Sequence, residues 1–203
     1  MKVIAVGMNY AAHNQEMQHA LKRTEPTIFM KGDSVLKDGK PFFIPGFSTE
    51  IHYETEVVIK ICRLGKNIAE QFACRYYEEV TVGIDFTARD LQTKLRSEGL
   101  PWEISKAFDN AAVTGRFIPL AEAGNINQLA FHLDINGQTV QQGNTCDMIF
   151  STDEIIACAS GFFTLRMGDL IYTGTPAGVG TVNIGDHLQG YLGDRKLLDF
   201  YVR

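Results

Sequence analysis

The sequence predicts an α+β fold in which strands outnumber helices, arranged as a single domain over residues 1–203. Three observations lead to this prediction: a central run that alternates with the period of a strand, a later run with the pattern of a β-hairpin, and a C-terminal part made of short apolar runs separated by glycine turns. No linker or low-complexity stretch interrupts the chain. At this length a folded chain buries roughly 70% of its extended-state surface, which is enough for one sizeable core.

The N-terminal segments have the pattern of strand, turn and helix. Residues 2–7 form a short apolar strand that ends in a glycine, and residues 11–22 mix good helix formers with spaced apolar positions. Pro26 ends this predicted helix, and residues 27–30 have the composition of a strand. Residues 32–46 contain several glycines and prolines, which predicts a long loop or flap.

The middle of the chain predicts two strands and two helices. Residues 52–61 alternate between two faces, which is the pattern of a strand. Residues 69–77 are predicted to be helical, and residues 80–86 to form the next strand. The sequence Thr87-Ala88-Arg89-Asp90 resembles a capping box, so we expect a helix that begins there and ends near Ser97.

The C-terminal part begins with a hairpin. Asn136-Gly137 separates the runs 131–135 and 138–142, and this dipeptide favours a type I′ turn. Residues 152–163 are predicted to form a helix, because acidic residues occupy its first turn and a serine or threonine is available as its cap. Only short strands and glycine turns are expected after it.

Composition excludes several classes of function. The chain has 19 Lys+Arg against 24 Asp+Glu, a net charge of −5 that provides no general attraction for nucleic acid or anionic lipid. The longest uncharged apolar stretch, residues 155–165, is too short to span a bilayer. The apolar run 3–6 is too short for a signal peptide, so we expect a cytoplasmic protein without a nucleic-acid or membrane partner.

The four cysteines have no metal-binding spacing, and a chain of this size does not depend on disulfides. We expect reduced thiols that lie mostly in the core; the alternative is a nucleophilic cysteine beside a histidine, which no local pattern supports. They are Cys62, Cys74, Cys146 and Cys158.

Glu54 and Glu56 are the most informative residues for function. An i, i+2 pair on a strand projects both carboxylates to one face, about 6.5 to 7 Å apart along the chain. Asp85, at the end of another predicted strand, is placed to supply a third carboxylate, and three carboxylates suit a hard cation such as Mg²⁺ or Mn²⁺. The alternative is an exposed edge strand whose two glutamates face solvent.

Three further groups are candidates for chemistry. His13 and Glu16 are neighbours on a helix, so the carboxylate can orient the imidazole for activation of water, unless the pair is an ordinary surface pair. Lys106 lies among large apolar residues and is a candidate for holding an anion, the alternative being a solvated lysine. The loop 173–180, which contains Thr175, can hold a phosphate or carboxylate with backbone N–H groups, or it can be a series of tight turns.

In their order and combination these residues resemble the fumarylacetoacetate hydrolase (FAH) family, in its short acylpyruvase-like branch. The resemblance covers nearly the whole chain. The matching runs are Gly-Met-Asn-Tyr-Ala-Ala-His at 7–13, His-Tyr-Glu-Thr-Glu at 52–56, Gly-Ile-Asp-Phe-Thr-Ala-Arg-Asp at 83–90, Gly-Leu-Pro-Trp at 99–102 with the lysine at 106, and Tyr-Thr-Gly-Thr-Pro-Ala-Gly-Val-Gly at 172–180.

The resemblance implies an FAH-type roll of mixed β-sheet with a few peripheral helices, normally a homodimer, without the separate N-terminal domain of fumarylacetoacetase. It implies a divalent-metal-dependent enzyme that acts on small 2-oxo acids through a metal-stabilised enolate, as an acylpyruvate C–C hydrolase or an oxaloacetate decarboxylase or tautomerase. The implied roles are metal binding by Glu54, Glu56 and Asp85, acid–base chemistry by His13 and Glu16, a substrate contact by Lys106, and looser substrate contacts by Arg89, Gln92 and Thr175.

Two positions depart from the family pattern. Met8 stands where many members of the branch carry an arginine, and Gly32 stands where a proline is usual. Both departures bear on the choice of substrate and leave the metal chemistry intact. The alternatives are an isomerase of 2-hydroxy-dienoate diacids, which the same family contains, and a metal-binding protein without turnover.

Overall fold

The computed structural model describes residues 1–17 and 24–203, and its largest sheet has the strand order β2-β1-β12-β5-β6-β8-β3, with β9 paired to β6. The pairs β1–β12 and β3–β8 are parallel and the other pairs are antiparallel, so the sheet is mixed, as predicted. Its strands are β1 (Val3–Gly7), β2 (Thr27–Lys31), β3 (Val35–Lys37), β5 (Thr55–Ile61), β6 (Tyr77–Asp85), β8 (Ala112–Thr114), β9 (Ile118–Pro119) and β12 (Leu170–Tyr172).

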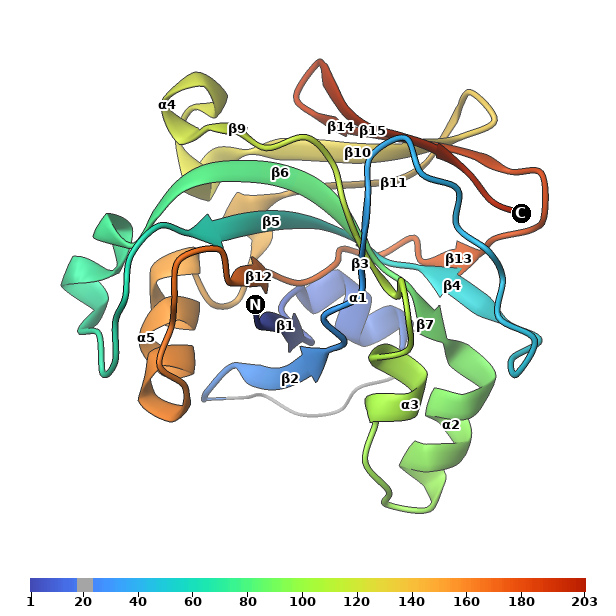
Figure 1. Cartoon of the computed structure of the whole chain (residues 1–203), viewed down its shortest axis with the longest axis horizontal. Coiled ribbons are helices and arrows are strands. Elements are labelled where there is room, and N and C mark those ends of the chain that lie inside the picture. The colour runs from blue at the N-terminus through green and yellow to red at the C-terminus, as the bar shows by residue number, and fades with distance from the viewer. Residues whose placement is uncertain (18–23) are drawn as a thin grey trace.

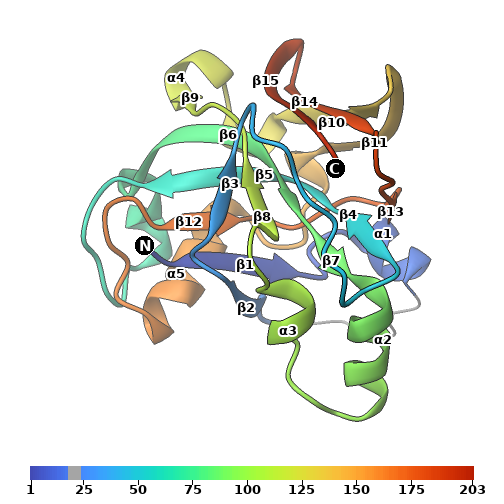
Figure 2. The ribbon, with the colours of Figure 1, turned by 45° about the vertical axis from the view of Figure 1, so that its right-hand side comes forward.

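Two smaller sheets complete the roll. A four-stranded antiparallel sheet lies over the curved β5–β6 pair (Figures 1 and 2), with β10 (Ala130–Ile135), β11 (Gln138–Asn144), β14 (His187–Leu192) and β15 (Arg195–Tyr201) in the order β11-β10-β14-β15. A three-stranded sheet is formed by β4 (Ile51–Tyr53), β7 (Thr87–Ala88) and β13 (Gly180–Thr181). Since β4 directly precedes β5 and β7 directly follows β6, the open end of the β5–β6 hairpin leads into this three-stranded sheet.

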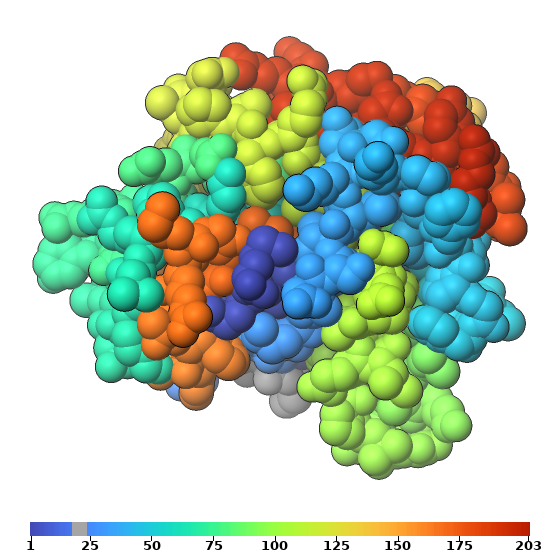
Figure 3. Space-filling view, in the orientation of Figure 1, coloured from blue at the N-terminus to red at the C-terminus, as the bar shows by residue number. Residues whose placement is uncertain are grey.

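The helices lie at the periphery of the sheets. The α-helices are α1 (Ala11–Glu16), α2 (Arg89–Ser97), α3 (Glu103–Lys106), α4 (Leu120–Ala123) and α5 (Thr152–Phe162), and the 3₁₀ helices are η1 (Glu70–Arg75), η2 (Ile126–Gln128) and η3 (Thr145–Asp147). The segment that holds α2 and α3 projects from the body of the molecule at the lower right of Figure 3. None of the helices in the described residues is long and apolar enough to cross a membrane.

The central strands are buried on both faces, which positions the site described below. Val57 and Val58 are both fully buried although they point to opposite faces of β5. Val57 packs into the main core, whereas Val58 packs into a smaller cluster with Val3 and Leu170. Side chains two and four residues before Val58 therefore point to the same face of the sheet as those of Val3 and Leu170.

Several local predictions are confirmed. The hairpin turns through Asn136 and Gly137 with φ of 53° and 79°, the two positive values that a type I′ turn requires. Helix α5 begins after Ser151, whose hydroxyl accepts from the backbone of Glu154 while the Glu154 carboxylate accepts from the Ser151 N–H.

Other local predictions are wrong or incomplete. The capping box at 87–90 does not form, because Thr87 and Ala88 pair with β4 as strand β7, and the methyl side chain of Ala88 occupies the N-cap of α2. The helix predicted over 69–77 is the shorter 3₁₀ helix η1, and the predicted loop 32–46 contains strand β3. Helix α1 ends at Glu16, and residues 18–22 of its predicted range lie outside the described residues.

The prediction for the cysteines is confirmed in their redox state but not in their burial. All four are free thiols, but none is buried: two are half-buried and two are exposed, so the prediction that they lie mostly in the core is wrong.

Candidate metal centre

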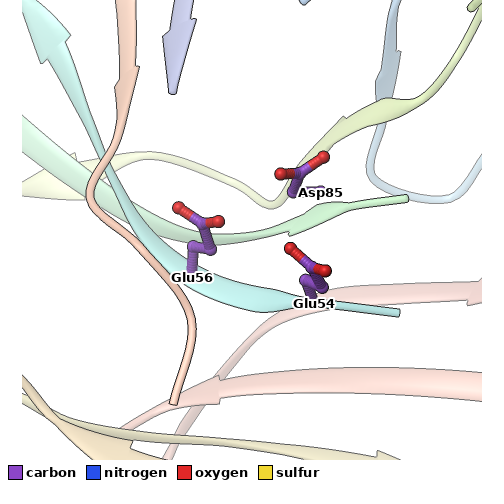
Figure 4. Close-up of side chains that lie close together, drawn as sticks. All are labelled: Glu54, Glu56 and Asp85. Carbon is purple, nitrogen blue, oxygen red and sulfur yellow. The ribbon is translucent and has the colours of Figure 1, made fainter. Parts of the chain in front are cut away.

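Three buried carboxylates lie together at the start of β5 and the end of β6. The backbone N–H of Asp85 donates to the carbonyl of Glu54 at 2.8 Å, so these residues lie opposite each other, and Glu56 follows two positions along β5. Opposed residues and residues two apart share a face, which makes their side chains neighbours. One oxygen from each carboxylate lies within 4.8 Å of the other two. Figure 4 shows the three side chains lying close together.

Burial decides between the two interpretations of the Glu-x-Glu pair. The exposed fractions of Glu54, Glu56 and Asp85 are 5%, 1% and 0%. An exposed edge strand is therefore the wrong interpretation. Because burying a carboxylate is costly unless it gains a cation or hydrogen bonds, the partners of each group determine what the cluster can hold.

Glu54 and Asp85 each have cationic partners. The Lys106 ammonium lies 2.7 Å from Oε2 of Glu54 and 2.8 Å from Oδ2 of Asp85, Arg89 pairs with the other oxygen of Glu54, and Lys31 pairs with the other oxygen of Asp85. Burial opposes ionisation of Glu54, but Lys106 and Arg89 outweigh it and hold the pKa of this carboxyl well below its usual range.

Lys106 stays cationic in this setting. Burial alone would lower the pKa of its ammonium, but Asp85 and Glu54 outweigh burial and raise it. Its exposed fraction is 3%, so the alternative of a solvated lysine is wrong. Lys106 can therefore hold an anion but cannot accept a proton.

Glu56 differs from its two neighbours. Its Oε2 accepts from the backbone N–H of Gly174 at 2.6 Å, and within the described residues no cationic side chain forms an ion pair with it. Burial, and then the nearby charge of Asp85, raise the pKa of its carboxyl well above the usual value. A further positive charge beside Glu56 would favour the ionised form of its carboxyl. Because all three side chains offer oxygen atoms, the cluster fits a hard divalent cation.

The loop that follows β12 holds carboxylates of the chain itself. Gly174 has φ of +107°, and a Cβ there would lie 2.7 Å from Cβ of Asn9, so glycine is required on two counts. The N–H of Gly178 donates to the carboxylate of Glu16 at 3.1 Å. The sequence predicted that N–H groups of this loop hold an anion. In the structure the anions that they hold are the carboxylates of Glu56 and Glu16.

Gly174→Ala is expected to lower the free energy of unfolding by about 2–4 kcal/mol, because it adds a clash to an unfavourable backbone conformation. It should also weaken metal binding, since displacement of the loop removes a hydrogen bond from Glu56. Gly185→Ala is the matched control: φ there is +99° and an added Cβ meets nothing within 4 Å, so it carries the conformational cost alone. Urea unfolding and Mn²⁺ titration of both variants test this, and equal losses in the two would contradict it.

His13 and Glu16 form the expected contact on α1. Nδ1 of His13 lies 3.4 Å from Oε2 of Glu16, and His13 is buried at an exposed fraction of 6%. Burial lowers the pKa of the imidazole and outweighs the opposing effects of Glu54 and Glu16. Glu16 itself is exposed, and the loop N–H of Gly178 donates to its carboxylate and so fixes its position beside His13.

A cleft connects these groups to the predicted substrate-binding residues. Its lining brings together every predicted site residue except Glu16, which lies behind His13. The lining residues are Val6, Gly7, Met8, His13, Phe29, Glu54, Glu56, Asp85, Arg89, Gln92, Arg96, Trp102, Lys106 and Thr175.

The predicted substrate-binding residues are already engaged with the protein. Arg89 donates to the Gln92 side chain and, through Nε, to Nδ1 of His52 at 3.2 Å, in addition to its ion pair with Glu54. The Thr175 hydroxyl donates to the carbonyl of Thr55 at 2.9 Å. These contacts hold the carboxylate cluster in place, and the predicted contacts with substrate stay predictions.

The two departures from the family pattern lie at this site. Met8 lines the cleft with a φ of 63°, unusual for a residue other than glycine. At Gly32, an added Cβ would lie 2.6 Å from the carbonyl oxygen of Ala107, next to Lys106. In this chain the close approach of the segment before β3 to the end of α3 therefore requires glycine.

Three polar residues that support the site were missed in the sequence. Lys31 pairs with Asp85, and Gln141 bridges the N–H of Thr55 and the hydroxyl of Thr175 at 2.9 and 2.8 Å. Asn9 donates to the carbonyl of Thr173 at 2.7 Å and so anchors the loop. A polar residue inside the predicted strand 138–142, or directly after the predicted strand 27–30, was the available signal, but nothing local identified its partner.

Comparisons with known proteins agree with this geometry. A family profile described as "Fumarylacetoacetate (FAA) hydrolase C-terminal" matches residues 2–201. The chain is similar to oxaloacetate tautomerase YcgM of Escherichia coli K12, with 40% identity over 92% of this chain and 86% of the relative, and to a mitochondrial oxaloacetate decarboxylase of Dictyostelium discoideum, with 38% identity over 91% and 85%. It is also similar to the crystal structure of fumarylpyruvate hydrolase from Pseudomonas aeruginosa in complex with Mn²⁺ and pyruvate, with a TM-score of 0.92 and 35% identity over 100% of this chain and 89% of that one.

Proposed function

Since the chain belongs to the fumarylacetoacetate hydrolase family, we propose that it is a divalent-metal-dependent enzyme that acts on 2-oxo acids through an enolate. The observation that carries the proposal is the buried cluster of Glu54, Glu56 and Asp85 in a cleft that also holds Lys106 and His13. Relatives named oxaloacetate tautomerase and oxaloacetate decarboxylase, and a similar structure of a hydrolase with Mn²⁺ and pyruvate, support the choice of substrate class.

Glu54, Glu56 and Asp85 are the proposed ligands of Mg²⁺ or Mn²⁺. The ion, when bound, supplies a Lewis acid that favours negative charge on the oxygens of a 2-oxo acid. Arg89 pairs with Glu54 and Lys31 pairs with Asp85, so two of these carboxylates are held in place before the ion arrives. Lys106 remains cationic and is placed to attract the anionic substrate and to stabilise a developing oxyanion.

His13 is the proposed group that moves protons. A carboxylate oxygen can only accept, so the contact with Glu16 places the imidazole proton on Nδ1 and the basic lone pair on Nε2. In hydrolysis this lone pair would take a proton from the water that attacks the distal carbonyl. In decarboxylation no water attacks, and in keto–enol tautomerisation the group only relays a proton.

Product analysis tests the proposal and separates its finer forms. Oxaloacetate, an acylpyruvate and fumarylpyruvate are each incubated with protein stripped by a chelator and with protein reloaded with Mg²⁺ or Mn²⁺. Tautomerisation or isomerisation leaves the mass unchanged and changes the ultraviolet absorption of the enol, decarboxylation releases CO₂, and hydrolysis adds water. We expect metal-dependent turnover of oxaloacetate, with tautomerisation or decarboxylation as the outcome. Metal binding without turnover of any substrate would instead identify a metal-binding protein.

Two other predictions belong to the same proposal. Residues 1–203 are proposed to act as one catalytic domain, and the protein is proposed to be a homodimer, as the family resemblance implies. Measurement of the mass in solution by light scattering distinguishes a dimer from a monomer.

A further inference from the structure

A second cavity lies farther along the sheet face that carries the carboxylates. Alternation puts Lys60 on the same face of β5 as Glu56 and Val58, about 13 Å from Glu56 at a strand rise of about 3.3 Å per residue. The cavity at Lys60 has a volume of about 510 Å³, which is within the usual range of small-molecule sites. Among the described residues it shares no lining residue with the metal cleft.

The floor of this second cavity is the edge of the smaller apolar cluster. Leu170 belongs to that cluster, and Val35 and Phe117 pack against it. Phe29 packs against the same cluster and lines the metal cleft, so the cluster separates the two hollows. A ligand with an apolar body would gain from leaving water on this floor, because these side chains offer it only apolar surface.

Cationic side chains outnumber carboxylates at the second cavity. In the described part of the chain its charged lining residues are Lys37, Lys60, Arg116 and Asp38. Lys60 pairs with Glu79, and Nε of Arg116 lies 3.7 Å from Oδ2 of Asp38. Lys37 forms no ion pair with any described residue. One positive charge is therefore left without a partner, in a chain whose net charge is −5.

The unpaired ammonium belongs to a side chain that faces the apolar floor. Val35 and Lys37 lie two apart on β3, so both point to the same face of the sheet. Strand β3 pairs with β8, and the residue opposite Val35 is Ala112, a member of the smaller apolar cluster. A molecule that lies on the floor beside Val35 is thus within reach of the Lys37 side chain.

We propose that this cavity is a second binding site, separate from the metal cleft, for a monocarboxylate with an apolar body. One unpaired positive charge matches one carboxylate, and the apolar floor matches the body of the ligand. The ring of Phe117 favours a body that is itself a flat ring. Binding should need no metal ion, because the carboxylate cluster lines the other hollow.

Two probes, 2-naphthoate and 2-naphthalenemethanol, test the site. Both have the same pair of aromatic rings, and only 2-naphthoate carries a charge. Their dissociation constants are measured by calorimetry on protein stripped of metal and on protein loaded with Mn²⁺. We expect 2-naphthoate to bind about fivefold more tightly than the alcohol, the size of one exposed ion pair, and to bind equally well in the two preparations.

Lys37→Glu tests the charge, and Lys40→Glu is its matched control. Lys40 is exposed in the same segment and does not line the cavity, so its replacement changes the net charge of the protein equally. Lys37→Glu is expected to weaken 2-naphthoate binding about tenfold and to change binding of the alcohol less than twofold. Lys40→Glu should leave both constants unchanged. Equal weakening by the two variants would reduce the effect to net charge and overturn the proposal.

Val35→Phe tests the apolar floor. Val35 is half-buried, so a larger side chain there can extend into the cavity and take the space of the ligand. Both probes should bind about tenfold more weakly, and a cooperative urea transition shows that the variant is folded. Binding of 2-naphthoate that requires Mn²⁺, or that is unchanged in both Lys37→Glu and Val35→Phe, would place the probe outside this cavity and overturn the proposal. None of these measurements requires turnover, so their outcome is independent of the proposed function.

Discussion

Glu56→Gln is expected to lower metal-dependent turnover at least 1,000-fold while the protein still folds. The variant has nearly the same shape as the wild type and loses one of three negative charges that face a common point. Because a direct ligand is removed, the loss should exceed the 10- to 100-fold typical of residues that only orient ligands. Turnover of oxaloacetate and the dissociation constant of Mn²⁺ are the measurements.

The same substitution should stabilise the metal-free protein, because Glu56 is a buried carboxylate without an ion pair among the described residues. An amide can still accept from the N–H of Gly174, and its NH₂ group can donate to a neighbouring carboxylate. We expect the free energy of unfolding to rise by about 1–3 kcal/mol in the absence of metal. A rise in stability together with a loss of metal affinity would identify Glu56 as a functional ligand, because replacement of a structural residue would lower the stability.

Glu70→Gln is the control for this pair of effects. Glu70 is exposed on η1, so its replacement removes the same charge without touching the cluster. It should change neither turnover nor metal affinity. Full metal-dependent turnover in Glu56→Gln, or in the more drastic Glu56→Ala, would show that the metal centre lies elsewhere.

The carboxylate cluster could be predicted because its geometry is local to two strands. Alternation along the predicted strand 52–61 puts Glu54, just before β5, and Glu56 on one face, and the end of β6 at Asp85 brings the third carboxylate beside them. Whether that face was exposed could not be predicted from alternation alone. Residues of both faces of β5 are buried, since each face packs into one of the two hydrophobic clusters of the roll.

The supporting residues could not be predicted because their partners are distant in the sequence. Lys31 is 54 positions from Asp85, Gln141 is 86 positions from Thr55, and Asn9 is 164 positions from Thr173. Such contacts depend on which strands become neighbours, and the parallel pairing of β1 with β12 joins the two ends of the chain. Local rules also failed where tertiary pairing prevailed, as at 87–88, whose pairing with β4 leaves no cap for α2.

His13→Ala should suppress hydrolysis of an acylpyruvate by about 100- to 10,000-fold, the usual contribution of a general base. Decarboxylation of oxaloacetate by the same preparation should fall less than tenfold, because that reaction requires no activated water. Both reactions are proposed to use the carboxylate cluster and Lys106, so the comparison isolates the step that needs His13. Equal losses in the two reactions would contradict this division of roles.

The Glu16→Gln variant tests whether His13 and Glu16 act together. Glu16 is exposed and does not line the cleft, so it acts on the substrate only through His13, and an amide there keeps a contact while it removes the charge. We expect hydrolysis to fall about tenfold and added imidazole to restore activity to His13→Ala but not to Glu16→Gln. A purely structural role for His13 would give no rescue by imidazole, because a lost packing contact is not replaced by a proton acceptor in solution. Rescue that rises with the fraction of neutral imidazole would therefore assign the base function to the ring at position 13.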